Sequence, residues 1–496
     1  MIEISRTWNN RLVGSLLITI SAIGTWVLFR LPFYHGYFFG DDSLLVNDAT
    51  NPNGPDDLVS QIFIVGGGKW RPLSTPLLLR MARYFGNDLV PFQILSMAFL
   101  IATAILIGLM VHRLTEKTTP SVFATVLVLS SPFTWLYQSW TYGVMESSAL
   151  FCTVISLYIL TKSFFSTMHA QLRIWVAFGF ILISTLIHER YIIVSLALFS
   201  IYTIFPKYAY LQKINSRIFL LTPLFHVVVK GLLLNLNPVT SGGESSGDTS
   251  LGLETVYRLL RGMQGVLGGL SGSGYYYSFG SFATKLNNNA APLIIPIGIV
   301  FLLVVAALFE IVTKSSHAKD APSEKSTQNA YPIAMIGIVG LSLLIPGALV
   351  EERFEGRWIL GPQILIISAV LITAFNFLTI RIVKCFMSLS LVVILLSVNW
   401  SYRSNSSDFF KLRNQTDKAL IKLEELVPKK GAWSLVIRST DSSAPINWQF
   451  AYGYALQQLS NPPYSLDGVC PSYRLDIPCF ILELTETDQI RLLQAS

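Results

Sequence analysis

The stretch VPFQILSMAFLIATAILIGLMV, residues 90–111, decides the fold class, because it carries no charged residue over its whole length. A helix needs about 20 mostly apolar residues to cross the hydrocarbon core of a bilayer. Comparable runs recur along the chain, and they predict about eleven membrane-spanning helices. These runs lie at 11–30, 90–111, 121–139, 143–161, 174–188, 191–206, 217–236, 291–312, 332–350, 357–376 and 385–400.

The composition of the chain supports an integral membrane protein. Of its 496 residues, 52% are hydrophobic and only 13% are charged, which is more apolar than a soluble core of this size accommodates. The net charge of +7 would suggest a nucleic-acid partner in a soluble chain. Here the basic residues lie in short segments between apolar runs, so we interpret them as signals of topology and expect the lipid bilayer, not a nucleic acid, as partner.

The positions of these basic residues predict the orientation of the chain. Short cytoplasmic connections are rich in Lys and Arg, whereas long outer loops are exempt from this rule. Alternate connections hold Arg6, Arg11, Arg113, Lys117, Lys162, Arg173, Lys207, Lys213, Arg217, Lys314, Lys319, Lys325, Arg381 and Lys384. We therefore expect a cytoplasmic N-terminus, with the connections of opposite parity outside the cell.

Two regions are expected from the change in polarity along the chain. Residues 1–400 form the membrane part, with large outer loops at 31–89 and 237–290. Residues 401–496 are more polar, with a helix-like run at 417–427 and strand-like runs at 434–439 and 479–484, which predicts a small extracytoplasmic α/β domain. Cys470 and Cys479 lie in this tail, and the sequence leaves open whether they form a disulfide.

The predicted orientation gathers scattered charged residues at the outer face. In FFGDDSLLVND, residues 38–48, Asp41 and Asp42 follow the first span directly. One carboxylate of such a pair acts as a general base while the other orients it or raises its pKa by repulsion. The alternative is structural, since Asp is a favoured N-cap for a helix beginning at Ser43.

Several cations on the same side are candidates for binding a phosphate, because a phosphate leaving group needs positive charge where water is scarce. They are Lys69, Arg71, Arg190, Lys230, Arg353 and Arg357. The bidentate fork of Arg suits a phosphate better than the ammonium of Lys. The alternatives are an interfacial helix with snorkelling cations after Lys69, and a snorkelling Lys230.

Glu146, His188 and Glu189 complete the set as candidates for binding a sugar or an acceptor. HERY, residues 188–191, connects two short spans, and ionisable residues at membrane depth are often functional. A solvated turn or a Glu–Arg pair would explain the same residues. No His/Cys cluster has zinc spacing and no Ser-His-Asp arrangement is evident, so no cofactor is predicted. A divalent ion bound by carboxylates is an open alternative that no motif supports.

The first outer loop resembles a known family. FFGDDSLLVND followed by KWRPLSTPLLLRMARYFG, residues 69–86, and then by a span is similar to the C-type glycosyltransferase (GT-C) superfamily. The similarity is greatest to the amino-terminal part of the transmembrane and tetratricopeptide-repeat O-mannosyltransferases and their bacterial relatives. HER at 188–190 resembles their Lys-Glu pair, with His188 in place of Lys. The resemblance covers roughly the first 200 residues, and the tail shows no repeat of about 34 residues.

The resemblance implies an inverting transferase that takes a sugar from a dolichyl- or undecaprenyl-phosphate donor, with Asp41 or Asp42 as base and Glu189 in support. The expected acceptor is a hydroxyl of a cell-envelope glycan or of a protein. The absence of repeats favours a glycan, and therefore a bacterial inner membrane. Two alternatives remain open: a transporter or flippase of lipid-linked sugars, and an O-antigen polymerase or ligase that uses a diphosphate-linked donor.

Overall fold

The computed structural model describes most of the membrane part and a small portion of the tail. The described residues are 2–29, 57–66, 69–86, 88–139, 141–164, 169–204, 216–234, 324–349, 358–377, 421–423, 425–426, 433–439, 478–484 and 490–495, with single residues or pairs between 255 and 266. The predicted spans 291–312 and 385–400 lie outside the described residues, as does most of the loop 237–290.

The described part of the chain is mostly helical. Its longer helices are α1 (Ile2–Phe29), α5 (Val90–Thr115), α6 (Thr118–Ser130), α8 (Gly143–Ser163), α9 (Ala170–Ile187), α10 (Ile192–Ile204), α15 (Glu324–Ser342) and α17 (Leu360–Phe377). Four segments are long and apolar enough to cross a membrane, namely Val90–Thr115, Gly143–Ser163, Ala170–Ile187 and Tyr331–Leu349. Shorter apolar helices cover Leu12–Leu28, Thr118–Ser130 and Leu360–Asn376. The chain is therefore a helical membrane protein, as the sequence predicts.

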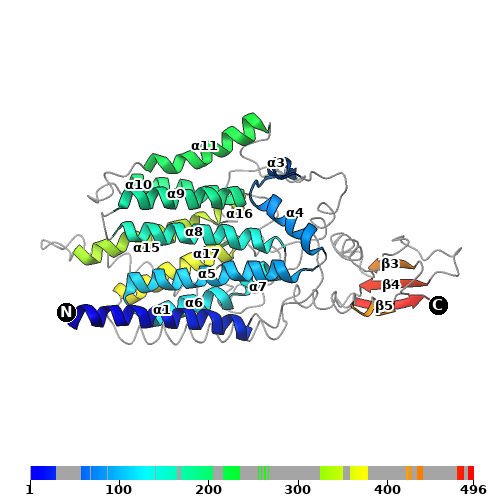
Figure 1. The fold of residues 1–496 in the computed structure, drawn as a ribbon, viewed down its shortest axis with the longest axis horizontal. Coiled ribbons are helices and arrows are strands. Elements are labelled where there is room, and N and C mark those ends of the chain that lie inside the picture. Colours follow the sequence, from blue (N-terminus) through cyan, green and yellow to red (C-terminus); the bar gives the residue numbers. More distant parts are fainter. Residues whose placement is uncertain are drawn as a thin grey trace.

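The long helices lie side by side and form a bundle, and the chain passes back and forth along it (Figure 1). Polar contacts join helix ends at one end of the bundle. Lys117 Nζ donates to the carbonyl of Phe375 at 2.9 Å, and Asn376 Nδ2 donates to the carbonyl of Leu114 at 2.9 Å. The short helices α3 (Leu58–Ile62), α4 (Ser74–Phe85) and α7 (Pro132–Ser139) lie at the other end.

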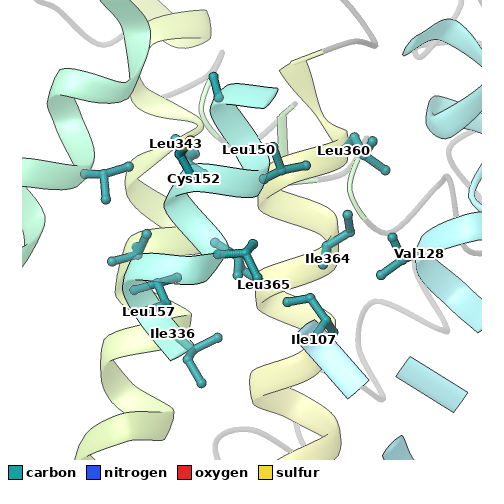
Figure 2. Close-up of a cluster of buried hydrophobic side chains, with 14 of the residues drawn as sticks. Ile107, Val128, Leu150, Cys152, Leu157, Ile336, Leu343, Leu360, Ile364 and Leu365 are labelled. Atoms are coloured by element: carbon teal, nitrogen blue, oxygen red, sulfur yellow. The ribbon is translucent and has the colours of Figure 1, made fainter. Parts of the chain in front are cut away.

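Helix α8 occupies the centre of the bundle. Figure 2 shows its residues Leu150 and Leu157 among side chains of α15 and α17, including Ile336, Leu360 and Leu365. All five side chains are buried. Because lipid tails are as apolar as these side chains, association depends on close packing of the helices rather than on removal from water.

Small residues permit that packing. A Cβ atom at Gly108 of α5 would lie 2.2 Å from Thr125 Oγ1 of α6 and 2.8 Å from Ile18 Cγ2 of α1. Only glycine fits where the three helices meet, which is the usual role of small residues at helix interfaces in membranes.

Three predicted spans are not single α-helices. The run 121–139 is divided at Ser131 into α6 and α7, because Pro132 lacks the N–H that would continue the first helix. The run 217–236 consists of a 3₁₀ turn, η3 (Ser216–Leu220), then α11 (Leu221–Val227) and a π-helix, η4 (Val228–Leu233). The run 332–350 is shared by α15 and α16 (Ile345–Leu349).

The tail contains a three-stranded sheet with the order β3-β4-β5. Its strands are β3 (Ser434–Ser439), β4 (Cys479–Leu484) and β5 (Ile490–Ala495); β3 is parallel to β4, and β5 is antiparallel to it. The two strands predicted from sequence are confirmed. Cys479 is disulfide-bonded, whereas Cys470 lies outside the described residues. The α/β domain as a whole stays a prediction.

Candidate functional site

Five ionisable side chains from three separate segments meet at the end of the bundle that carries α3, α4 and α7. Arg71 follows β2 (Lys69–Trp70), and Glu146 lies in the first turn of α8. His188, Glu189 and Arg190 connect α9 to α10, where Glu189–Tyr191 form the 3₁₀ turn η2. Segments more than a hundred residues apart thus contribute to one cluster, as the predicted orientation requires.

Arg71 and Glu189 form a bidentate ion pair. Arg71 Nε donates to Glu189 Oε2 at 2.8 Å, and Arg71 Nη2 donates to Glu189 Oε1 at 3.1 Å, although the two residues are 118 positions apart. The two parallel bonds fix the plane of the guanidinium as well as its position. The pair therefore ties the first outer loop to the connection between α9 and α10.

Backbone contacts hold this loop in place beside Arg71. The N–H of Leu73 donates to the carbonyl of Leu186 at 3.3 Å, and Ser74 Oγ donates to the carbonyl of Ile187 at 2.8 Å. The last carbonyls of a helix have no partner within it. The residues after Arg71 thus satisfy the end of α9 and position the guanidinium at the same time.

Glu146 is the second buried acid, and it pairs with Arg190. Arg190 Nη2 donates to Glu146 Oε2 and lies 3.3 Å from the hydroxyl of Tyr137 and 3.4 Å from that of Tyr191. Glu146 is 1% exposed. An unpaired charge at that depth would be strongly destabilising, so Arg190 stabilises the buried carboxylate, and the predicted role of Glu146 in binding a sugar or an acceptor stays a prediction.

His188 connects the two ion pairs. Its Nδ1 accepts the backbone N–H of Arg190 at 3.4 Å, and its Nε2 lies 3.3 Å from Glu146 Oε1. The acceptor role of Nδ1 favours the neutral tautomer with its proton on Nε2, directed at Glu146. Nδ1 also lies 3.7 Å from Glu189 Oε2. In this tautomer His188 can position Glu146 through Nε2, whereas its unprotonated Nδ1 only adjoins Glu189.

The electrostatics of the cluster keep Glu189 ionised and His188 neutral. Burial alone would raise the pKa of Glu189, but the charge of Arg71 and its hydrogen bonds to the carboxylate lower that pKa well below its usual range. Burial lowers the pKa of His188, and this effect is larger than that of the Glu146 charge, which raises it. At neutral pH the two arginines therefore balance the two carboxylates.

Lys230 adds a positive charge beside this balanced set. It is 2% exposed, lies in η4, and is close enough to Glu189 and Arg71 to interact with them electrostatically. It makes no hydrogen bond or ion pair with another described residue. Among the predicted phosphate-binding residues with described side chains, Lys230 is therefore the cation without a carboxylate partner.

Aromatic and polar side chains surround Lys230. His226, one helical turn before it, lies with Nε2 3.1 Å from Thr185 Oγ1. The ring of Trp70 packs at 5.9 Å from that of His226 and at 6.2 Å from that of Phe225. Trp70 Nε1 donates to the carbonyl of Ile62 at 3.0 Å. π-Helical turns such as η4 are frequent at functional sites, because they redirect side chains.

Several predicted residues lie outside this description. Asp41, Asp42, Arg353 and Arg357 are outside the described residues, and the side chain of Lys69 is not described. The predicted residues that the structure brings together are Arg71, Glu146, His188, Glu189, Arg190 and Lys230. Sequence reasoning missed Trp70, Tyr137 and Tyr191, although Trp70 and Tyr191 each adjoin a predicted site residue.

Within the described ranges, no group of three or more His, Cys, Asp or Glu side chains is arranged to hold a metal ion. The expectation that no cofactor is required therefore stays a prediction for the chain as a whole.

Comparison with known proteins gives no relative for this chain: no family model matches it, and neither does any curated protein. The GT-C resemblance rests on the motifs of the sequence alone.

Proposed function

We propose that the chain is a membrane glycosyltransferase that moves a sugar from a polyprenyl-phosphate donor to a hydroxyl acceptor on the extracytoplasmic face, with inversion at the anomeric carbon. The acceptor is a cell-envelope glycan or a protein. The dolichyl- or undecaprenyl-phosphate class of donor comes from the motif resemblance. The chemistry of the cluster supports it independently.

The observation that carries the proposal is the buried Lys230 beside a charge-balanced cluster. A buried ammonium without a counter-charge is costly, and intramembrane cations pair with anions or mark substrate pathways. No carboxylate of the described residues pairs with Lys230, and a lipid phosphate at the end of the bundle would supply a negative charge beside it. Its polyprenyl chain would remain in the bilayer while the sugar faces water.

The described acids are better suited to positioning than to proton transfer. Because Arg71 holds the pKa of Glu189 low, Glu189 is a weak base at neutral pH. The carboxylate of Glu146 already forms an ion pair with the guanidinium of Arg190. The motif resemblance implies Asp41 or Asp42 as the base, and in the proposed mechanism Glu189 orients Arg71.

In this mechanism the acceptor oxygen attacks the anomeric carbon and its proton passes to the aspartate. The bond between the anomeric carbon and the phosphate oxygen breaks, and polyprenyl phosphate leaves with the electron pair. Lys230, Arg71 and the predicted cations Lys69, Arg190, Arg353 and Arg357 would stabilise the negative charge that develops on that phosphate.

Two further observations support the proposed orientation. Arg113, Lys117, Lys162 and Arg173 border helix ends that lie away from the cluster, as basic cytoplasmic connections would. Cys479 is disulfide-bonded, and disulfides persist mainly in oxidising compartments outside the cytoplasm. We infer an inner-membrane protein of a bacterium with its tail in the periplasm.

A reconstituted assay tests the reaction class. Purified protein in proteoliposomes is given polyprenyl-phosphate sugars with label in both the sugar and the lipid, together with cell-envelope glycan acceptors. We expect free polyprenyl phosphate to appear in step with glycosylated product. Movement of the intact donor between leaflets without release would indicate a transporter. Turnover of diphosphate-linked donors only would indicate a polymerase or ligase.

The same assay tests the proposed base. Asp41→Asn and Asp42→Asn replace each carboxylate by an amide that cannot accept the proton, so we expect at least one of them to lose transfer while donor binding persists. Asp57→Asn is the matched control, because Asp57 caps α3 through its bond to the N–H of Ser60 and Asn caps equally well. Full activity of both folded variants would remove the aspartate mechanism.

A further inference from the structure

An exposed apolar surface covers α3 and α4 at the end of the bundle that holds the cluster. Its members are Leu58, Val59 and Phe63 of the α3 segment and Leu77, Tyr84 and Phe85 of α4; we call it the first-loop patch. Val59 is 64% exposed and Tyr84 is 83% exposed. The opposite side of α4, with Leu78, Leu79 and Ala82, is buried in the bundle.

The two ends of α4 fix its depth in the membrane. Its first residues bond to the carbonyls of Leu186 and Ile187, at the end of the spanning helix α9. Its last residue, Phe85, precedes the spanning helix α5 by only four residues. α4 therefore lies across the end of the bundle at the level where spanning helices stop, as Figure 1 shows. That level is the headgroup region of a bilayer.

The charge of α4 indicates which surface it meets. The helix carries Arg80 and Arg83 and no acidic residue. Arg80 is exposed, with Nε 3.4 Å from Gln61 Oε1 of α3. Apolar and aromatic side chains next to arginines are characteristic of helices that lie in the membrane interface and attract anionic lipids.

Hydrogen bonds and a strand pairing connect the first-loop patch to the segment that carries Arg71. Gln61 joins α3 to α4 through Arg80, and the carbonyl of Ile62 accepts Trp70 Nε1 immediately before Arg71. The strands β1 (Val65–Gly66) and β2 close the hairpin between them, with Val65 opposite Trp70. The described residues 57–66 and 69–86 are thus joined to one another by contacts that lead to Arg71.

We propose that the first-loop patch docks on the headgroup region of the membrane, that Arg80 and Arg83 select anionic phospholipids there, and that this docking holds Arg71 against Glu189. The docking follows from exposure, depth and charge alone. Only the statement that Arg71 thereby serves a donor site rests on the proposed function.

Site-directed fluorescence tests the docking without an activity assay. In full-length protein with Cys152 and Cys385 replaced by serine, an environment-sensitive dye is attached at Val59→Cys or Tyr84→Cys in nanodiscs. Leu16→Cys, on the exposed face of α1, serves as the control for the hydrocarbon core, and Leu493→Cys, on β5, as the control for water. We expect blue-shifted emission at both patch positions, quenched more by a spin label near the headgroup than by one deep in the acyl chain.

Emission like that of the Leu493→Cys protein would overturn the docking. Blue-shifted emission that no lipid-borne quencher reduces would identify a protein partner and would also contradict it. The charge requirement is tested in nanodiscs of phosphatidylcholine with and without phosphatidylglycerol. Anionic lipid should increase quenching, and Arg80→Gln/Arg83→Gln should abolish that increase. Quenching that is independent of lipid charge would overturn the anionic preference. None of these results depends on whether a sugar is transferred.

Discussion

Glu146 and Arg190 show at the scale of single residues what burial demands of charge. Glu146 lies at the start of a central helix where water does not reach it, and Arg190 brings its guanidinium there from another segment. Such a pair adds little stability compared with apolar residues of the same size, but removal of one member leaves the other uncompensated. The pair therefore constrains how α8 and the α9–α10 connection meet.

Replacement of Glu146 alone should be costly. We expect Glu146→Gln to lower the free energy of unfolding by about 3–5 kcal/mol, because Arg190 loses its counter-charge. Thermal unfolding of the detergent-solubilised protein measures the change. Glu116→Gln, at an exposed position beyond the far end of α5, should remain near wild type. Equal stability of the two variants would show that the buried pair is not formed.

The pH dependence of stability is a second prediction at this scale. The pKa values of His188 and Glu189 are both lowered in the folded protein, so the unfolded state binds more protons and stability rises with pH. The contribution of His188 is complete above its ordinary pKa of about 6.5 and is lost as the pH falls through the folded value. That of Glu189 is lost at lower pH, below its ordinary pKa of about 4.3.

We therefore expect the unfolding temperature of the wild type to fall between about pH 7 and pH 5, and His188→Gln to flatten that fall. His169→Gln, a histidine at the exposed start of α9, should keep the wild-type slope. The same slope in the His188→Gln and wild-type proteins would contradict the assignment of His188 as a buried, neutral histidine.

At the scale of elements, the junction of α7 and α8 positions Tyr137 against Arg190. A Cβ atom at Gly143 would lie 1.5 Å from the carbonyl oxygen of Tyr137, so the start of α8 fits under α7 only with glycine there. Pro132 and Gly143 together explain why the predicted span 121–139 ends early and turns back toward the cluster.

Gly143→Ala should consequently displace α7 and weaken the contact of the Tyr137 hydroxyl with Arg190. We expect a loss of about 1–3 kcal/mol, the usual cost of overpacking. Gly179→Ala in α9 is the matched control, because a Cβ atom at Gly179 meets nothing within 4 Å and alanine favours helix by about 0.5–1 kcal/mol. Thermal unfolding compares the two, and a neutral Gly143→Ala would contradict the close approach.

At the scale of the whole molecule, the proposed reaction requires Asp41, Asp42 and the cluster to face the same compartment. Cysteines placed at Asp42 and at Asp88, in the exposed link between α4 and α5, should react with a membrane-impermeant maleimide from the extracytoplasmic side of intact cells. A cysteine at Lys117, at the far end of α5, should react only after the membrane is permeabilised. Labelling of positions 42 and 88 from opposite sides would contradict the proposed site.

Sequence patterns predicted the parts of this fold that depend on local composition. The apolar runs at 90–111 and 143–161 are helices α5 and α8, and the strand-like runs at 434–439 and 479–484 are β3 and β4. The period of the apolar residues and the length of each run determine such elements. The grouping of Arg71, Glu146 and the HERY segment followed from topology, because the positive-inside rule places loop ends on a common side.

The pairings within the cluster could not be predicted in this way. Nothing local assigns Arg71 to Glu189 or Arg190 to Glu146, since each pair depends on how helices pack in three dimensions. Trp70 was missed because an aromatic next to cations is also typical of a membrane interface. The π-helix around Lys230 was missed because an inserted residue leaves the apolar pattern of a helix nearly unchanged.

Donor binding by Lys230 variants tests the central claim most directly. Lys230→Met removes a buried positive charge that pairs with no carboxylate of the described residues, so we expect affinity for a polyprenyl-phosphate sugar to fall by about 10- to 100-fold while the protein stays folded. Lys162→Met, at the far end of α8 and about 24 Å along the helix from Glu146, should bind the donor like wild type. Equal donor affinity in the wild-type, Lys230→Met and Lys162→Met proteins would contradict the account.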